Sequence, residues 1–526
     1  MIRTVAVVLV CVSLPSRAVA QSVMGCSTQD FLRTVAALSA DSMEGRRPGT
    51  AGAERAAAYI ATAFRAAGLT SPSGDFRQRV PLVMLRTTRS SLTIRGPRRA
   101  SLTTGDSGVT ITSENTSDVR ITGVRETVYV GYGIHAPDAG HDDFDGVDLR
   151  GRIVVMRSGA PDSARLKLPW GRDDVRATDP YKLAVLRSRG AAGAVFLMSG
   201  KSLAPEDREV LTLPRANALD LVAWLDSAAS VRFAVAAGFD AASIPAPRAT
   251  RSASLERVSF ETHQEVAQTD AANIVGLIPG RSADAETVLY TAHYDHLGVR
   301  HRAGQTDSIY NGALDNAAGV SALICLARRF EADKDSLRRS IVLLATTAEE
   351  HSGHPGSAWY VEHPVVPLAR TVVALNIDGI NTLAPTDDYM VLPGSLVDDV
   401  GLIATAGTAA GMTLSAASFE RGMDWSFDTE AFNRRGIPAL TIWQGFRGRG
   451  MTPQDFFRLS RARNATYHTP FDTLSTAWSS DAIEQHLRLL REVGLRFAMA
   501  SSRPRLQAST PFSIWPVIDD TTRRRN

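Results

Sequence analysis

The sequence predicts an α/β fold in which a mostly parallel, mixed sheet is covered by helices, with a smaller β-rich domain inserted ahead of it. Two observations carry this prediction. From about residue 273 onward, short apolar runs alternate with helical runs, a pattern typical of a parallel sheet with helices on both faces. Between about residues 126 and 255, glycine-punctuated β-rich runs indicate a separate module.

The individual elements follow from hydrophobic periodicity and from turn residues. In the C-terminal half we expect strands at 274–278, 288–292, 341–346, 372–377 and 439–442, and helices at 317–330, 358–363, 401–411 and 481–500. Upstream we expect two helices on either side of a turn at 44–49, a strand-rich stretch at 80–125, strands at 128–134, 151–156 and 190–198, helices at 181–189 and 218–228, and a linker at 236–251.

The length of 526 residues exceeds what one hydrophobic core usually holds. The composition shifts suggest a signal peptide at 1–20, an N-terminal helical and β segment at 21–125 that packs with the main domain, the inserted module at 126–255, the main domain at 256–502 and a tail at 503–526.

The composition also excludes some functions. The formal net charge of +3 gives no overall field to attract nucleic acid. Beyond the N-terminus, no apolar stretch reaches the length of a transmembrane helix, so we expect none in the mature chain. The composition leaves the oligomeric state open.

The N-terminus has the pattern of a secretory signal. Arg3 precedes an apolar run at 5–14, and small residues at 18–20 form a cleavage site, so we expect cleavage after Ala20 and a periplasmic or secreted protein. Lipid attachment at Cys26 is a weaker alternative. With Cys11 removed, Cys26 and Cys325 remain, and Cys325 is predicted to be a small buried hydrophobe rather than part of a disulfide framework.

Polar side chains of metal-ligand type follow the ends of the predicted apolar strands, where α/β sheets build their sites. They are His293, Asp295, Asp315, Glu349, Glu350 and Asp378, together with His468 in a later loop. Each alone has an ordinary structural explanation: Asp315 could cap a helix and His293 could be a hydrogen-bonded structural histidine. Adjacent carboxylates straight after a buried strand, however, are costly unless cations compensate them.

Imidazole and carboxylate ligands suit zinc, and a two-ion site needs one bridging carboxylate. We therefore expect two Zn²⁺ ions, with Asp315 as the bridge, His293 and Asp378 on one ion, and Glu350 and His468 on the other. These five are the predicted metal ligands.

Two further residues are predicted to be catalytic. Glu349, beside the ligand Glu350, would be free to act as general base. Asp295 could accept the second imidazole N–H of His293 and fix its tautomer. We interpret His296 and His301 as surface or supporting residues, and His351 and His354 as loop residues. The sequence thus predicts a hydrolase in which water is the nucleophile.

Five ordered motifs carry a family resemblance over about residues 273–500. The sequence resembles the co-catalytic zinc aminopeptidases, which include secreted bacterial leucyl aminopeptidases and glutamate carboxypeptidase II. The matching segments are Thr291-Ala-His293-Tyr-Asp295-His-Leu-Gly298, Asn311-Gly-Ala-Leu-Asp315-Asn-Ala-Ala-Gly319, Thr347-Ala-Glu349-Glu350, Asn376-Ile-Asp378 and Tyr467-His468-Thr-Pro470. The resemblance implies the same ligands, the same base and a peptide substrate cleaved from its N-terminus.

Two details qualify the resemblance. The inserted module is similar to a protease-associated domain at residues 131–134, 148–154 and 190–194. Where the family often has Ser-Asp-His-x-x-Phe, this chain keeps only the aspartate and phenylalanine, as Asp428 and Phe432. Because this region lines the substrate pocket in relatives, specificity does not carry over from them.

Three alternatives to an aminopeptidase stay open. A glutamate carboxypeptidase-like enzyme or dipeptidase would need a basic cluster at the pocket, for which Arg421, Arg434, Arg447 and Arg449 are candidates. A glutaminyl cyclase relative would bind one zinc ion. A non-catalytic, receptor-like relative would be expected to have lost ligands, and here every ligand is present.

Overall fold

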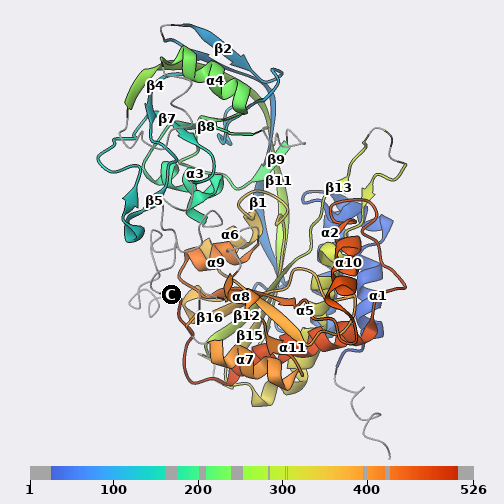
Figure 1. Cartoon of the computed structure of the whole chain (residues 1–526). Coiled ribbons are helices and arrows are strands. Elements are labelled where there is room, and N and C mark those ends of the chain that lie inside the picture. Colours follow the sequence, from blue (N-terminus) through green and yellow to red (C-terminus); the bar gives the residue numbers. More distant parts are fainter. Residues whose placement is uncertain are drawn as a thin grey trace, which may run out of the picture.

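Two long antiparallel strands, β1 (Arg77–Ile94) and β11 (Ala253–Ile278), run between two lobes in the computed structural model of the chain (Figure 1). We call this pair the ribbon. The structure describes residues 25–96, 98–161, 175–200, 209–238, 253–281, 285–302, 304, 306–394, 397–398, 400–420 and 427–507. The predicted signal peptide, most of the predicted linker and most of the C-terminal tail lie outside these residues.

The large lobe contains the predicted mixed sheet. Its strands lie in the order β18-β17-β19-β16-β12-β15-β11, and the central pairs β19–β16, β16–β12 and β12–β15 are parallel. Their bounds are β12 (Thr287–His293), β15 (Ser340–Thr346), β16 (Thr371–Asn376), β17 (Asp388–Leu392), β18 (Thr413–Leu414) and β19 (Ala439–Gln444). Every residue of β12, β15 and β16 is buried, as expected for strands covered on both faces.

Helices cover both faces of this sheet, because alternate strand residues point to opposite sides. Val288 and Tyr290 of β12 pack with one set of helices, and Leu289 packs with the other. The first set is α1 (Thr28–Leu38), α2 (Ala51–Ala66), α5 (Gly319–Asp333), α7 (Val400–Ala409) and α11 (Ser480–Met499); the second is α6 (Pro355–Glu362) and α9 (Thr429–Arg434). Helices α8 (Ala417–Glu420) and α10 (Pro453–Asn464) complete the lobe. The predicted fold class is confirmed.

The small lobe lies at the other end of the ribbon (Figure 1). Four of its strands lie parallel: β4 (Arg120–Tyr129), β7 (Ile153–Arg157), β8 (Gly193–Leu197) and β10 (Leu221–Leu225). The lobe also contains β2 (Ala100–Thr103), β3 (Val109–Thr112), α3 (Asp179–Ser188) and α4 (Ser227–Ala236). The short strands β5 (His135–Ala136) and β6 (His141–Asp142) form a separate pair. Strand β9 (Glu209–Thr212) pairs with β1 of the ribbon.

One sequence prediction for the small lobe is wrong, and another stays a prediction. The expected helix at 218–228 is wrong: this stretch forms β10 and then the start of α4, where Asp226 caps the helix by accepting the Ala229 N–H. Its apolar run is short enough for either structure, so periodicity alone could not distinguish them. The predicted domain boundary near residue 125 stays a prediction, although side chains from both sides of it, such as Leu102 and Val195, share one core cluster.

The structure pairs Cys26 with Cys325 in a disulfide, so the prediction that Cys325 is an unpaired hydrophobe is wrong. The bond joins the segment before α1 to the middle of α5 across 299 residues of sequence. Spacing could not reveal this, because the two cysteines meet only after α1 packs on α5. Among the residues that the structure describes, no helix combines the length and hydropathy needed to cross a bilayer.

A fully buried arginine ties the N-terminal segment to the large lobe. The Arg46 guanidinium donates to the backbone carbonyls of Leu38 at 2.7 Å, Tyr294 at 2.7 Å, Asn311 at 2.6 Å and Gly312 at 2.9 Å. The Gly312 carbonyl also accepts the Ala317 N–H, but Arg46 is the donor to the buried carbonyls of the other three residues, which come from three separate segments. The segment that contains α1 and α2 is therefore a structural part of the large lobe.

We expect Arg46→Met to lower the free energy of unfolding by more than about 3 kcal/mol, because it leaves buried carbonyls without donors. Urea unfolding monitored by circular dichroism measures this change. The control is Arg33→Met on α1, whose side chain is 63% exposed and should change stability by less than about 1 kcal/mol. Equal stability of the Arg46 variant and the wild type would contradict this role.

Candidate metal centre

The parallel register of the sheet brings the predicted site residues to one edge. His293 ends β12 and pairs with Thr346 at the end of β15, so the loop that carries Glu349 and Glu350 starts beside it. On the other side, β12 pairs with β16, and Asp378 follows the end of β16. The carboxyl ends of neighbouring parallel strands meet at one edge, which places these side chains together.

One group of possible ligands contains His293, Asp315 and Asp378. The His293 Nε2 atom lies 3.2 Å from Asp315 Oδ1 and 3.5 Å from Asp378 Oδ1. His293 and Asp315 are buried, and Asp378 is only partly exposed. These are the three residues that the sequence assigned to one ion.

A second group contains His296, Asp315, Glu350 and His468. The His468 Nε2 atom lies 3.2 Å from Asp315 Oδ2 and 3.0 Å from Glu350 Oε2. Asp315 therefore belongs to both groups, one carboxylate oxygen facing each, as expected of a bridging residue. The roles of these residues as ligands stay a prediction.

The sequence interpretation set His296 aside, but the structure buries it fully within the second group. Its Nδ1 atom lies 2.6 Å from Glu350 Oε1 and 3.8 Å from Asp315 Oδ2. The interpretation as a surface residue is thus wrong, and a role supporting Glu350 fits the contact. The sequence contained a signal of this burial, because His296 lies three residues after His293, at the end of a buried strand.

Asp295 lies at the site but holds a different partner from the one predicted. The His293 Nδ1 atom lies 3.2 Å from the backbone carbonyl of Asp295 and 3.8 Å from its carboxylate. The carboxylate instead accepts the backbone N–H groups of Glu349 at 3.0 Å and Glu350 at 3.4 Å. Asp295 therefore positions the loop of the two glutamates, while its main chain orients the His293 imidazole.

Glu349 has the environment of a proton acceptor. It is 8% exposed, its Oε2 atom lies 3.9 Å from His293 Nε2, and its Oε1 atom has no hydrogen-bond partner in the described part of the chain. Burial raises the pKa of the Glu349 carboxyl well above its usual range; the charge of His293 opposes this shift and that of Asp378 adds to it. A raised pKa makes a carboxylate a stronger base near neutral pH.

The pKa values of the neighbouring carboxylates Glu350 and Asp295 are shifted in different directions. Burial and the charge of Asp315 act to raise the pKa of Glu350, but His296 and His468 oppose them and lower it to about 2. Burial raises the pKa of Asp295 to about 7 against the charge of His293. The pKa values of the two adjacent glutamates, Glu349 and Glu350, are thus shifted in opposite directions.

Two residues that the sequence analysis did not single out hold the Asp315 loop. The Asp472 carboxylate accepts the N–H groups of Leu314 at 2.9 Å and Asp315 at 3.0 Å. The Asn316 amide donates to the Ile377 carbonyl at 2.9 Å, and its oxygen accepts the N–H of Gly379 at 2.9 Å. These bonds tie the loop before α5 to the loops that carry Asp378 and His468. Asp472 lies four residues after His468, which is the signal that could have found it.

The segment that departs from the family pattern also contacts the site. Asp428 is buried and accepts a short hydrogen bond from the Thr346 hydroxyl at the end of β15, and Phe432 is fully buried in the core. Asp428 therefore supports the sheet edge, and Phe432 packs in the core on one face of the sheet. Residue Arg421, a candidate for acidic-substrate binding, lies outside the described residues.

Comparisons with known proteins agree with this architecture. Residues 273–494 match the model of peptidase family M28. An aminopeptidase from Aneurinibacillus sp. strain AM-1 has the same fold, with a TM-score of 0.50 and 17% identity over 93% of this chain and 96% of that chain. BSAP, a zinc aminopeptidase from Bacillus subtilis, aligns with a TM-score of 0.44 and 19% identity over 89% of this chain and 95% of that chain. No curated protein matches the chain.

The matched segment begins in β11 and ends in α11, so it contains the sheet edge and all the residues of both candidate ligand groups. Residues 273–494 are therefore similar to a domain of peptidase family M28, and the chain is a peptidase.

Proposed function

We propose that the chain is a two-zinc aminopeptidase that removes N-terminal residues from peptides. One observation carries the proposal: two groups of histidine and carboxylate ligands share the single residue Asp315, with the buried Glu349 carboxylate beside them. Such a pair of groups is what a two-ion hydrolytic site requires. The fold shared with the aminopeptidase from Aneurinibacillus supports the same activity.

The unsatisfied atoms of the site fit bound cations. Among the described residues, His293 Nε2, His468 Nε2 and Asp315 Oδ2 are buried without hydrogen-bond partners. Buried polar atoms without partners are rare in native proteins unless an ion or water satisfies them. His293, Asp315 and Asp378 would hold one Zn²⁺, and Asp315, Glu350 and His468 the other. Bound zinc supplies positive charge that polarises the scissile carbonyl and lowers the pKa of water.

The chain's own residues then move the proton. Glu349 accepts a proton from the attacking water and donates it to the leaving amine, consistent with its raised pKa. Asp295 holds the backbone of this loop in place through its two N–H contacts. The surrounding carboxylates provide negative charge for the free α-amine of the substrate.

The other expectations from the sequence complete the proposal. Residues 126–255 would be a protease-associated domain, which the parallel strands β4, β7, β8 and β10 of the small lobe support. The signal-peptide pattern supports a periplasmic or secreted enzyme. The disulfide between Cys26 and Cys325 is consistent with an oxidising compartment.

We expect Asp315→Asn to lower the zinc content of the purified protein from about two ions per chain to well under one, because Asp315 belongs to both ligand groups. Asp378→Asn, which touches only one group, should retain about one ion. Atomic emission spectroscopy after dialysis measures the content. Asp388→Asn, a buried carboxylate elsewhere, is the control and should keep both ions. Full zinc content in the Asp315 variant would refute the bridging assignment.

We expect Glu349→Gln to keep its zinc and to lower kcat on a leucyl anilide by about 100- to 10,000-fold, because the general base is lost. Dialysis of the wild type against a chelator should abolish activity, and added zinc should restore it. The matched control is Glu126→Gln, an exposed glutamate of the small lobe, which should leave kcat unchanged. Near-normal turnover by the Glu349 variant would show that another group accepts the proton.

We expect the chain to be exported when it is expressed in full in a bacterial host, with the mature protein beginning at Gln21. Mass spectrometry of the N-terminal peptide checks this. Ala18→Glu combined with Ala20→Glu should block processing, since the cleavage site needs small residues. A lipid-modified Cys26 or an uncleaved N-terminus would show that the predicted cleavage is wrong.

A further inference from the structure

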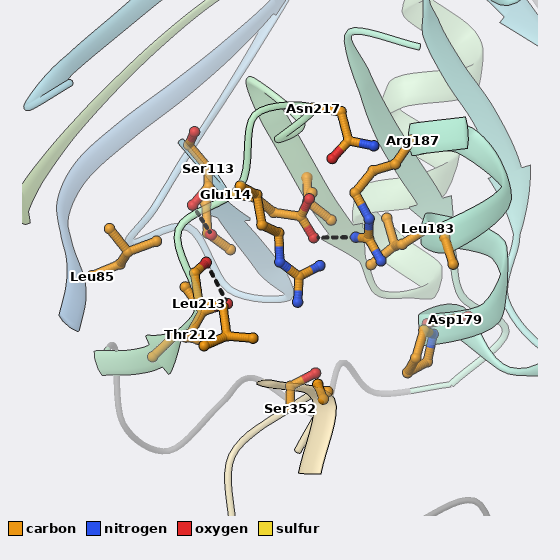
Figure 2. Close-up of a pocket in the computed structure, with 18 of the residues that line it drawn as sticks. Leu85, Ser113, Glu114, Asp179, Leu183, Arg187, Thr212, Leu213, Asn217 and Ser352 are labelled. Atoms are coloured by element: carbon orange, nitrogen blue, oxygen red, sulfur yellow. Dashed lines mark hydrogen bonds and ion pairs between the residues drawn. The ribbon is translucent and has the colours of Figure 1, made fainter. Parts of the chain in front are cut away.

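A cavity of about 1090 Å³ lies between the two lobes and is lined by His354, a neighbour of Glu349. Its walls come from α3 and the loop after β9 in the small lobe, and from α6, α9 and the 352–354 loop in the large lobe. Figure 2 shows Leu183 and Arg187 of α3 on one side and Ser352 of the large lobe on another. This volume is at the upper end of that of small-molecule sites, so it can hold part of a peptide.

The cavity is separated from the proposed general base by one side chain. His354 lines the cavity, and its Nδ1 atom lies 3.0 Å from the Glu349 backbone carbonyl and 3.6 Å from Glu349 Oε1. On its other side, His354 Nε2 lies 4.0 Å from Glu430 Oε2, which also lines the cavity. A ligand in this cavity would therefore extend away from the reacting centre toward the small lobe.

Most charged groups at the cavity already have partners. Arg187 forms an ion pair with Glu114 at 2.7 Å, as the dashed line in Figure 2 shows. Arg434 pairs with Glu430, and Arg435 pairs with Glu362. The remaining carboxylates are bound as well: Asp179 accepts from Ser158 and Trp224, and Asp106 accepts from Thr103.

Arg215 is different. Within the described ranges, its guanidinium forms no hydrogen bond or ion pair, and it is only partly exposed. It projects from the small lobe toward the large one, since a Cβ atom at Gly353 would lie 3.3 Å from its terminal nitrogen. Burial lowers the pKa of Arg215 to about 10, and the charge of Arg187 acts in the same direction, so it is still cationic at neutral pH. A half-buried guanidinium without a partner is suited to bind an anion from solution, and a carboxylate matches its two-pronged geometry.

We propose that this cavity binds the part of a peptide substrate beyond the scissile bond and that Arg215 binds the C-terminal carboxylate of short peptides. This inference rests on the proposed peptidase function of the neighbouring site. The apolar wall of the cavity includes Leu183, Leu213 and Val361. In this proposal it contacts the substrate side chains between the scissile bond and the C-terminal carboxylate. Arg215 is thus a specificity-determining residue that the small lobe contributes.

The test compares tri-leucine with tri-leucine amide, which differ only in the C-terminal charge, and uses a leucyl anilide as a substrate without a carboxylate. The wild type should have a lower KM for the acid than for the amide. Arg215→Gln should raise KM for the acid by about 10- to 100-fold, the value of a charge-assisted hydrogen bond, and leave KM for the amide and anilide within about two-fold. Arg215→Lys should recover part of the difference.

Arg150→Gln is the matched control, because Arg150 is an arginine of the small lobe that is 81% exposed, and it should change none of the three KM values. Equal KM values for acid and amide in the wild type, or an equal rise for all substrates in Arg215→Gln, would overturn the inference.

A binding measurement separates this inference from the proposed function. Calorimetric titration of Glu349→Gln with tri-leucine and its amide, with and without Arg215→Gln, reports acid preference without turnover. If the wild type hydrolyses no anilide but the acid preference is present and depends on Arg215, the proposed activity fails and the carboxylate site stands. If the anilide is hydrolysed and no acid preference is found, the carboxylate site fails alone.

Discussion

Negative charge crowded at one edge of the sheet is the constraint on which the rest of the structure depends. Asp295, Asp315, Glu349, Glu350 and Asp378 lie within contact distance of one another or of the same imidazoles; the first three are buried and the other two are only partly exposed. Ionised carboxylates at such positions are expensive unless cations or hydrogen bonds compensate them.

The chain itself provides part of the compensation. Three histidines approach these oxygens, and backbone N–H groups point at Asp295 and Asp472. Arg46 adds a buried positive charge next to the loops of the site. Burial lowers the pKa of Arg46 to about 10, while the charge of Asp315 acts in the opposite direction. Since Arg46 belongs to the segment before residue 273, a residue outside the matched family segment also holds the loops of that segment.

The sequence predicts much of this arrangement because the strong signals are local. The strands around His293, Glu349 and Asp378 are uninterrupted apolar runs, and the polar residues follow directly at their ends. Local patterns could not reveal contacts made by packing. Three such contacts join segments far apart in the chain. They are the disulfide between Cys26 and Cys325, the hydrogen bonds from Arg46 to four carbonyls, and the contact of the buried His296 with Glu350. The small-lobe helix at 218–228 was wrong because a short apolar run does not choose between strand and helix.

The ribbon of β1 and β11 connects the two lobes and contains one irregularity in its pairing. Strand β9 pairs with β1 of the ribbon along Val83–Arg86, and the register of β1 with β11 shifts between Thr87 and Arg89. Irregularities of this kind bend a strand pair and increase its twist. This bend lies where β11 leaves β4, since β4 pairs with β11 only as far as His263. Evolution could retune which molecules fit between the lobes by single changes at this bend, while every residue of the catalytic edge stayed the same.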